Sequence, residues 1–168
     1  EFDAAIAVFT SAQTLAPDDS TFDLYLAQAF LSARQFDRAI AVTGAAITRS
    51  PEDERLIRLR AQALGRAGRA SEAISYLEGA IKSESRSPQL ALALADAYAA
   101  DKRYDEAIRV VQQAETAFGE DDVFTMRRAS LYDEAGRVPD AERELRAMIE
   151  RDPLDAGALN FLGYILAG

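Results

Sequence analysis

Four arginines lie within thirteen positions of the segment ERLIRLRAQALGR. The guanidinium group presents a planar fork of N–H donors that grips a carboxylate at two points, so clustered arginines suit an acidic ligand. Offsets of about 3, 7 and 11 residues return to one side of a helix, at about 100° per residue. We call the residues on that side the arginine stripe: Arg55, Arg58, Gln62 and Arg66. Arg60 falls on the opposite, apolar side.

The composition excludes most common catalytic chemistry. The chain has no Cys, His or Trp, which excludes a thiol nucleophile, a serine–histidine triad, a disulfide framework and a zinc site of the usual ligand types. A formal net charge of -9 disfavours adhesion to nucleic acid or anionic membranes, because both need a cationic footprint. No apolar run approaches the roughly 18 residues that span a bilayer. We therefore expect no enzyme, no cofactor, no metal, no nucleic-acid partner and no membrane insertion.

The chain repeats itself with a period of 34 residues. The segments FDAAIAVF, FDRAIAVT, ASEAISYL, YDEAIRVV and VPDAEREL share a central alanine at that spacing: Ala5, Ala39, Ala73, Ala107 and Ala141. Two further registers hold small and bulky residues: Ala27, Ala61, Ala95, Ala129 and Gly163, then Phe30, Leu64, Tyr98, Tyr132 and Leu166. Such self-similarity is typical of an array in which each unit packs on its neighbours.

Each unit predicts two amphipathic helices joined by a short turn. In the unit with the arginine stripe, four apolar residues recur at helical spacing on the opposite side: Leu56, Ile57, Ala61 and Leu64. Gly68 and Gly136 stand where a first helix would end. The second helices are expected to start at N-cap residues or a first-turn proline: Asp3, Asp37, Ser71, Asp105 and Pro139. The recurring alanines mark places where helices cross closely.

This pattern resembles the tetratricopeptide repeat family. One unit carries the positions of the family pattern in order: Leu26, Ala27, Phe30, Phe36, Ala39, Ala46 and Pro51. The resemblance covers the whole chain, and the phrase ALNFLGYILA is similar to bacterial members. It implies an all-α fold, a right-handed α-α superhelix of antiparallel helix pairs with the first helix of each pair on the concave face. It also implies that a peptide or protein binds on that face.

We expect a single array over residues 1–168. Full repeats are predicted at 20–53, 54–87, 88–121 and 122–155, flanked by a second helix alone at 1–19 and a first helix alone at 156–168. Each terminal helix lacks its partner, and neither end shows the polar cap that is usual for a solenoid. We interpret the chain as a piece of a longer array, and we expect its open terminal helices to self-associate or to be covered by a neighbouring chain.

The resemblance places one row of first-helix side chains in the concave groove. The row changes from neutral and apolar, through the arginine stripe, to acidic toward the C-terminal end. The candidate peptide contacts are Leu24, Gln28, Arg55, Arg58, Gln62, Arg66, Leu92, Asp96, Met126 and Ser130. We hypothesise that the stripe arginines receive an acidic or carboxylate-ended peptide, and that the leucines and the methionine take its apolar side chains. The alternative is that these arginines only solvate an exposed helix face and pair with glutamates.

Arg60 and Arg128 depart from the family pattern, because they stand in the packed slot that Leu26 fills in its unit. An unpaired buried charge is costly, so we expect a packed aliphatic stem with a head that is paired or directed outward. We predict a structural role for both. The family's clamp for chaperone tails is not expected, since Ala93 fills a slot that should be polar and only Arg127 is in place.

The favoured function is a non-catalytic scaffold that binds a protein or peptide segment in the groove. One alternative is a self-assembly module. Another is a domain that positions a catalytic domain within a larger protein. The repeats leave the identity of the partner and the compartment open, because a fold does not imply a function.

Overall fold

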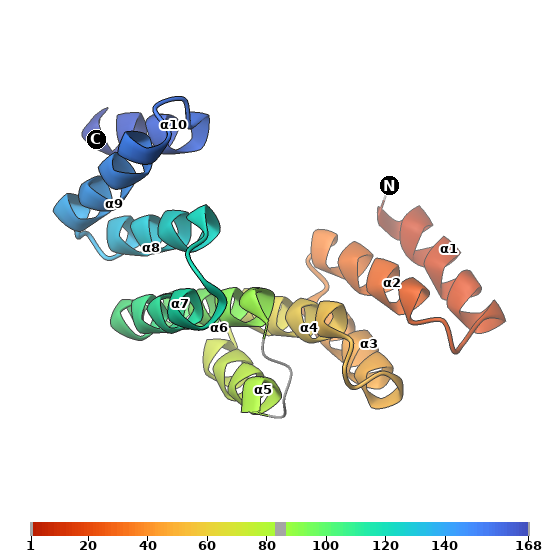
Figure 1. Cartoon of the computed structure of the whole chain (residues 1–168). Helices are drawn as coiled ribbons and strands as arrows, with labels where there is room; N and C mark the ends of the chain where they lie inside the picture. The colour runs from red at the N-terminus through yellow and green to blue at the C-terminus, as the bar shows by residue number, and fades with distance from the viewer. Residues whose placement is uncertain (1, 83–86, 168) are drawn as a thin grey trace. The chain divides into compact units, whose positions relative to one another are not determined.

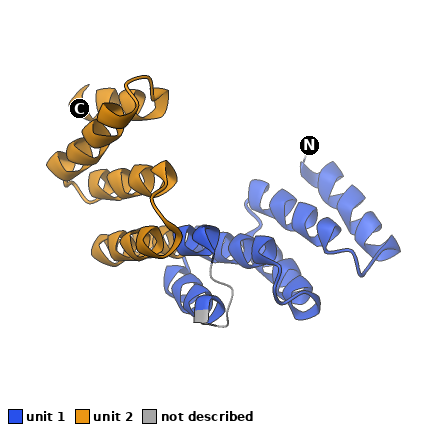
Figure 2. Cartoon of the chain, in the orientation of Figure 1, with its two compact units in different colours: residues 1–93 blue, residues 94–168 orange. Residues whose placement is uncertain are grey.

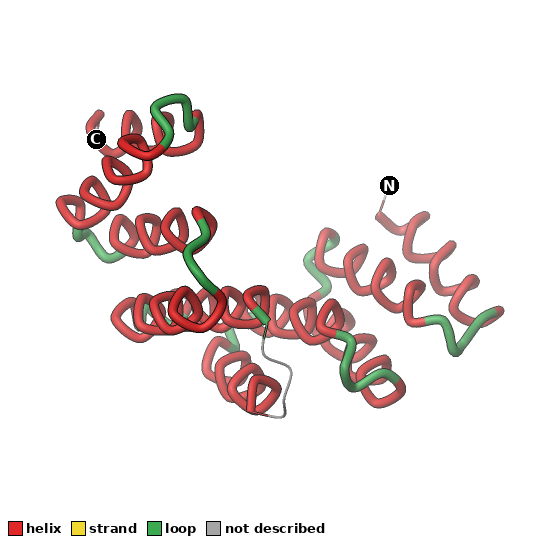
Figure 3. The backbone as a smooth tube through the Cα atoms, in the orientation of Figure 1, coloured by secondary structure: helices red, strands yellow, loops and turns green. Residues whose placement is uncertain are grey.

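The computed structural model describes residues 2–82 and 87–167, and these ranges hold ten α-helices and no β-strand, joined by short loops (Figures 1 and 3). The first helices of the pairs are α2 (Ser20–Ser32), α4 (Glu54–Arg66), α6 (Pro88–Ala100), α8 (Asp122–Glu134) and α10 (Ala156–Ala167). The second helices are α1 (Phe2–Leu15), α3 (Phe36–Arg49), α5 (Ala70–Lys82), α7 (Tyr104–Phe118) and α9 (Val138–Arg151). The predicted all-α helical-repeat fold class is confirmed.

The helices form two compact units, residues 1–93 and 94–168, and the division falls within α6 (Figure 2). In the first unit α2 packs on α1 and α3, while α4 packs on α3, α5 and α2. In the second unit α8 packs on α7 and α9, and α9 also packs on α10. The boundaries of the four full repeats stay a prediction, and residues 83–86 of the repeat 54–87 lie outside the described residues.

Every first helix is capped by a side-chain oxygen, and the caps recur every 34 residues. Asp19, Asp53 and Asp121 each accept the backbone N–H of the residue two positions on, at 2.9, 3.0 and 2.9 Å. Ser87 and Asp155 accept the N–H of the third residue on, at 3.2 and 3.0 Å. Such an oxygen satisfies one of the amide groups that a helix leaves without an intrahelical partner. The capping series thus sets where the five first helices begin.

Each turn between a first and a second helix contains one residue with positive φ. These residues also recur every 34 positions: Arg34, Gly68, Lys102 and Gly136, with φ of 58°, 76°, 59° and 71°. The next residue then donates its N–H back to the first helix, as in the 2.9 Å bond from Arg69 to the Leu64 carbonyl. The predicted helix-ending role of the two glycines is confirmed. Arg34 and Lys102 adopt the same left-handed backbone with a side chain attached, which costs conformational energy.

The starts of the second helices differ from the prediction. Four expected N-cap residues follow the first helical residue and therefore lie in the first turn: Asp3, Asp37, Ser71 and Asp105. Their predicted capping role is wrong. In α7 the N-cap position is held by Arg103, which makes no side-chain cap bond and pairs instead with Glu106 at 3.0 Å. Pro139 does lie in the first turn of α9, as predicted.

The alanine registers form buried seams between helices. The second-helix alanines of the four central pairs are fully buried: Ala39, Ala73, Ala107 and Ala141. The first-helix alanines are at most 5% exposed: Ala27, Ala61, Ala95 and Ala129. In the second unit Ala129 clusters with Leu145, Met148 and Ala158, so that one core joins α8, α9 and α10. Small side chains let helix axes approach closely, which is the role the repeat pattern predicted for them. Within the described ranges, no helix has the length and apolar character needed to cross a membrane.

Candidate peptide-binding surface

The arginine stripe occupies the solvent-facing side of α4. All four of its members are exposed. On the opposite side Leu56, Ile57, Ala61 and Leu64 are at most 5% exposed. Leu59 and Ala63 are also buried, because α4 packs on α2 as well as on α3 and α5. Packing on three helices leaves α4 only a narrow strip of exposed surface, and the stripe is part of it.

Arg55 is already engaged by the cap of its own helix. Its Nε lies 3.0 Å from Asp53 Oδ1 and its Nη2 lies 2.7 Å from Oδ2, so the fork grips the carboxylate at two points. The hydrogen bond to Asp53 raises the pKa of Arg55, and the nearby Tyr25 hydroxyl adds a smaller effect. The same bond lowers the pKa of Asp53. A ligand carboxylate would therefore have to compete with Asp53 for Arg55.

Arg58 and Arg66 are in a different situation. Both side chains are exposed, and no carboxylate of the described residues lies within 4.0 Å of either guanidinium. Eight residues separate them, which corresponds to about 12 Å along a helix. Arg66 also stands in the last turn of α4, where the helix dipole favours a cation. These two side chains keep their full capacity to bind an external anion.

The adjacent first helix, α2, supplies apolar surface in the same unit. Leu24 is half-buried and Gln28 is exposed, and their contact with a ligand stays a prediction. Tyr25, which was not among the predicted contacts, is 53% exposed and stacks on Phe9 with 5.4 Å between ring centroids. An aromatic residue next to Leu24 in a first helix was the available signal. Tyr25 extends the candidate surface, because its amphipathic ring lies near Arg55.

The second unit uses its polar first-helix residues differently. Arg127 on α8 donates from Nε to Asp96 Oδ1 at 2.8 Å and from Nη1 to Glu134 Oε1 at 2.8 Å. Ser130 joins this network, lying 3.1 Å from Arg127 Nη1 and 3.0 Å from Glu134 Oε1. Two of the predicted contacts, Asp96 and Ser130, are thus brought together by an arginine that two carboxylates neutralise. Because its Nε and Nη1 groups already donate to these side chains, Arg127 cannot grip a peptide carboxylate at two points.

The two remaining apolar candidates are only partly exposed. Met126 packs against the cluster of α8, α9 and α10, and Leu92 is half-buried on α6. Their predicted contacts with a ligand stay predictions. Among the described residues, no group of three acidic side chains is arranged to hold a metal ion.

Arg60 has a packed stem and a satisfied head, as predicted. Its Nη1 donates to the Ile40 carbonyl of α3 at 2.7 Å, and its guanidinium lies over the ring of Tyr76 of α5, 5.5 Å from the centroid. Gly44 makes room for it, since a Cβ at that position would lie 2.5 Å from Arg60 Nη1. The side chain joins three helices of the first unit and is not part of the exposed surface.

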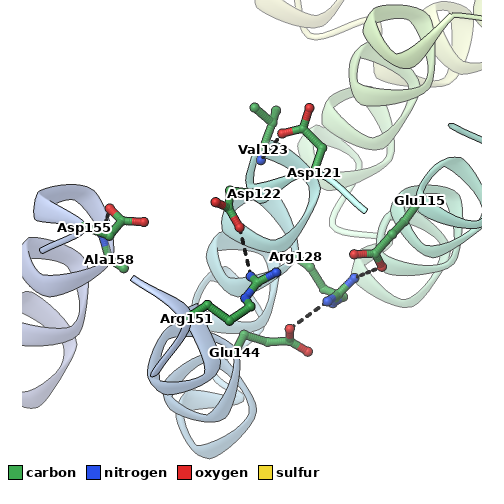
Figure 4. Close-up of polar contacts among 9 residues, drawn as sticks. All are labelled: Glu115, Asp121, Asp122, Val123, Arg128, Glu144, Arg151, Asp155 and Ala158. Atoms are coloured by element: carbon green, nitrogen blue, oxygen red, sulfur yellow. Dashed lines mark hydrogen bonds and ion pairs between the residues drawn. The ribbon is translucent and has the colours of Figure 1, made fainter. Parts of the chain in front are cut away.

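Arg128 also has a structural environment, with different partners. Its Nη1 lies 2.5 Å from Glu115 of α7 and its Nη2 lies 2.7 Å from Glu144 of α9 (Figure 4). The Arg128 side chain is 11% exposed, and the hydrogen bond that it donates to Glu144 is the main cause that raises its pKa. Arg151 of α9 pairs with Asp122 of α8 at 2.8 Å in the same region. These contacts fasten α8 to the two helices that flank it.

The comparisons with known proteins agree with this architecture. The tetratricopeptide repeat family model matches residues 1–63, 66–124 and 99–163. The chain belongs to the tetratricopeptide repeat family. No curated protein matches the chain.

Several solved structures share its fold. A thermophilic tetratricopeptide protein of Thermus thermophilus is 22% identical with a TM-score of 0.79, and the match covers 99% of this chain and 91% of that one. A tetratricopeptide protein of Parabacteroides merdae is 17% identical with a TM-score of 0.78, covering 98% and 64%. YrrB, described as having an unusual peptide-binding site, is 19% identical with a TM-score of 0.59, covering 95% and 82%. At these identities the likeness shows the fold alone.

Proposed function

We propose that the chain is a non-catalytic scaffold whose first-helix surface binds a protein or peptide segment, and that an acidic segment docks on Arg58 and Arg66. The observation that carries this proposal is the contrast among the arginines of the first helices. Arg55, Arg60, Arg127 and Arg128 have carboxylate or carbonyl partners, whereas Arg58 and Arg66 have none among the described residues. Family membership supports the same class of function, because tetratricopeptide proteins typically mediate protein–protein interactions.

The geometry of α4 suggests a spacing for the ligand. Arg58 and Arg66 are about 12 Å apart along the helix, and an extended peptide advances about 3.3 Å per residue. Two acidic residues four positions apart would therefore match the two guanidinium groups. In an extended segment such residues project from the same side. Apolar side chains beside them would contact Leu24 and the ring of Tyr25, which continue the surface on α2.

The test uses labelled peptides of twelve residues that carry two glutamates, with alanine and leucine elsewhere. We expect a peptide with the glutamates four positions apart to bind more tightly in fluorescence anisotropy than one with a spacing of three. An exposed arginine–carboxylate contact contributes about 0.2–1 kcal/mol, so loss of two such contacts in the Arg58→Ala, Arg66→Ala double variant should weaken binding by up to about thirtyfold. The loss should shrink at high salt, because exposed charges are screened.

A matched control removes two equally exposed arginines from elsewhere in the chain. Arg34 and Arg109 are exposed, and no carboxylate of the described residues lies within 4.0 Å of them. The Arg34→Gly, Arg109→Ala variant changes the net charge by the same amount and should bind the peptide like the unmodified protein. Equal binding by the Arg58, Arg66 variant and the unmodified protein would refute the docking site. Equal losses in both double variants would show only an effect of net charge.

The other predicted contacts enter this proposal with smaller roles. Gln28 and Gln62 are exposed and can hydrogen-bond a peptide backbone. Contacts of Leu92, Asp96, Met126 and Ser130 with a ligand stay predictions. A positioning role within a larger protein and self-assembly both stay predictions.

A further inference from the structure

A cleft in the first unit lies between two successive turns, the one that joins α2 to α3 and the one that joins α4 to α5. Its volume is about 550 Å³. The charged residues that line it are Arg34, Asp37, Arg38 and Arg69. We call this space the turn cleft. Three arginines against one aspartate make the turn cleft cationic, although the chain has a formal net charge of -9.

The turn between α2 and α3 departs from a charge pattern that the three later turns of this type share. In each of those turns, an arginine forms an ion pair with an acidic residue three positions later: Arg69 with Glu72, Arg103 with Glu106, and Arg137 with Asp140. At the same two slots, the turn between α2 and α3 carries Gln35 and Arg38. A base replaces the acid of the pair, so this turn lacks the ion pair.

The fold nevertheless holds the Arg38 guanidinium in a defined place. In the second unit an arginine lies over the ring of a first-helix tyrosine, 4.7 Å from the centroid: Arg103 over Tyr98, and Arg137 over Tyr132. Phe30 stands at the same register, and Arg38 lies over it at 4.2 Å, although its slot is three residues later. Arg38 Nη1 donates to the neutral Gln35 Oε1 at 2.7 Å, and no carboxylate of the described residues lies within 4.0 Å of this guanidinium. Arg38 is therefore positioned on a ring but has no counter-ion.

The other charged groups of the turn cleft leave it open to an anion. Arg34 is exposed and has no carboxylate of the described residues within 4.0 Å. Arg69 is gripped by Glu72 and lies 3.7 Å from Asp37. The Asp37 side chain is 92% exposed, so solvent and salt screen its repulsion of an incoming anion. Two arginines without acidic partners thus line the turn cleft.

The chemistry of the turn cleft favours a phosphate group over a carboxylate. One guanidinium satisfies both oxygens of a carboxylate, as Arg69 does with Glu72 at 2.7 and 2.6 Å. A phosphate monoester has three terminal oxygens and a charge of about -1.5 to -2 at neutral pH, so it can accept from two arginines and balance both. The volume of the turn cleft is also within the range of about 300–1,000 Å³ that is usual for small-ligand sites.

We propose that the turn cleft binds a phosphate group through the guanidinium groups of Arg34 and Arg38. This site is separate from the peptide-docking arginines, because Arg58 and Arg66 do not line the turn cleft. The Arg58→Ala, Arg66→Ala variant should therefore bind phosphate like the unmodified protein. The peptide proposal and the phosphate proposal can fail independently.

The test follows the backbone amide signals of residues 34–38 and 67–69 by nuclear magnetic resonance. Inorganic phosphate should shift these signals in a saturable way, and acetate should bind more weakly because it carries one charge and two oxygens. A short phosphoserine peptide forms a third arm. Tighter binding of this peptide than of inorganic phosphate would assign the phosphate to a protein partner. Equal or weaker binding of the peptide would assign it to a small ligand.

The decisive variant gives this turn the ion pair of the later turns. The Gln35→Arg, Arg38→Glu exchange installs the pair that Arg103 and Glu106 form, so the protein should keep its helix content and thermal stability. An acid then replaces a base in the turn cleft, and phosphate should bind at least about tenfold more weakly. The control Arg109→Ala lowers the net charge by the same single unit at an exposed position elsewhere, and it should bind phosphate normally.

Four results would overturn the proposal. Absence of a saturable shift with both inorganic phosphate and the phosphoserine peptide shows that the turn cleft binds no phosphate. Unchanged binding by the exchange variant shows that Arg38 does not hold the anion. Equal binding of acetate and phosphate shows a general attraction of anions. Equal losses in the exchange variant and in Arg109→Ala show an effect of net charge alone.

Discussion

Arg60 in the first unit and Arg128 in the second occupy the same register of the repeat, yet their guanidinium groups have chemically different partners. Arg60 is held by a backbone carbonyl and an aromatic ring, both uncharged. Arg128 lies between two carboxylates from the helices on either side. The repeat therefore fixes where the guanidinium lies, while the residues at two neighbouring slots decide whether it is part of an ion-pair network. The same backbone position accepts leucine, as at Leu26 and Leu94, provided that its neighbours are apolar.

The largest effect should come from removing both carboxylates around Arg128. The Glu115→Ala, Glu144→Ala variant leaves a charge that is 11% exposed without a partner, and we expect about 3 kcal/mol of destabilisation in denaturant unfolding. Adding Arg128→Leu should recover most of this loss, because leucine fills the slot in two other repeats. Failure of leucine to restore stability would show that the lost glutamate stems, not the stranded charge, caused the effect.

The contribution of Arg60 to stability should depend on Gly44, which lies against its guanidinium group, and not on acidic side chains. Gly44→Ala gains about 1 kcal/mol of helix propensity but forces Arg60 Nη1 away from its carbonyl, which costs a comparable amount. We expect little net change in the unmodified protein and about 1 kcal/mol of stabilisation in an Arg60→Leu background. Gly79→Ala has open space around the added Cβ and should stabilise both backgrounds equally. Additive effects of Gly44→Ala and Arg60→Leu would contradict the contact.

The turns with a positive-φ residue allow a second comparison between repeats, here of the backbone conformation. Each unit has one such turn with glycine, Gly68 or Gly136, and one with a side chain, Arg34 or Lys102. Arg34→Gly and Lys102→Gly should raise the free energy of unfolding by up to about 1 kcal/mol, since they relieve left-handed strain. Gly68→Ala and Gly136→Ala should lower it by about 1 kcal/mol. Thermal unfolding of the four variants measures these changes in stability. If the exchanges to glycine and the exchanges from glycine changed the stability in the same direction, backbone strain would be excluded as the cause.

The smallest effect concerns the cap that holds Arg55. Because the pKa of Asp53 is lowered in the folded state, its stabilising contribution is present above its unfolded pKa and is lost as pH falls through its folded pKa. Asp53→Asn keeps a cap oxygen but removes this ion pair, so it should cost less than about 1 kcal/mol at neutral pH and nothing in strong acid. Unfolding measured from neutral to acidic pH tests this. The variant should also bind the acidic peptide more tightly, because it releases Arg55.

Much of the fold followed from the 34-residue period. Helix pairs, buried alanine seams and the glycine turns were predictable, because each depends on local spacing and on small side chains. The positive φ of Arg34 and Lys102 was not, since neither residue type favours that backbone. The helix starts at Phe36 and Tyr104 were missed because the capping rule was applied to the aspartates that follow them. The caps that do operate, such as Asp53, stand before the first helices.

The candidate site was only partly predictable. The arginine stripe could be placed on one side of α4 from helical spacing alone. The availability of the arginines other than Arg55, whose partner Asp53 is two positions away, could not, because it depends on carboxylates that folding brings near. Asp96 reaches Arg127 from 31 positions away in the chain, and Tyr25 comes near Arg55 from the adjacent first helix.

By itself, then, the sequence determined the period, the helical pairing and the side of α4 that faces water, because these follow from residue types at fixed local offsets. The tertiary structure alone decided that Arg127 is paired with Asp96, while Arg58 and Arg66 have no carboxylate partner among the described residues. It also decided that Arg60 meets a ring where Arg128 meets acids. The physical reason is that a charge is satisfied or exposed according to the groups that other helices bring within a few ångströms of it.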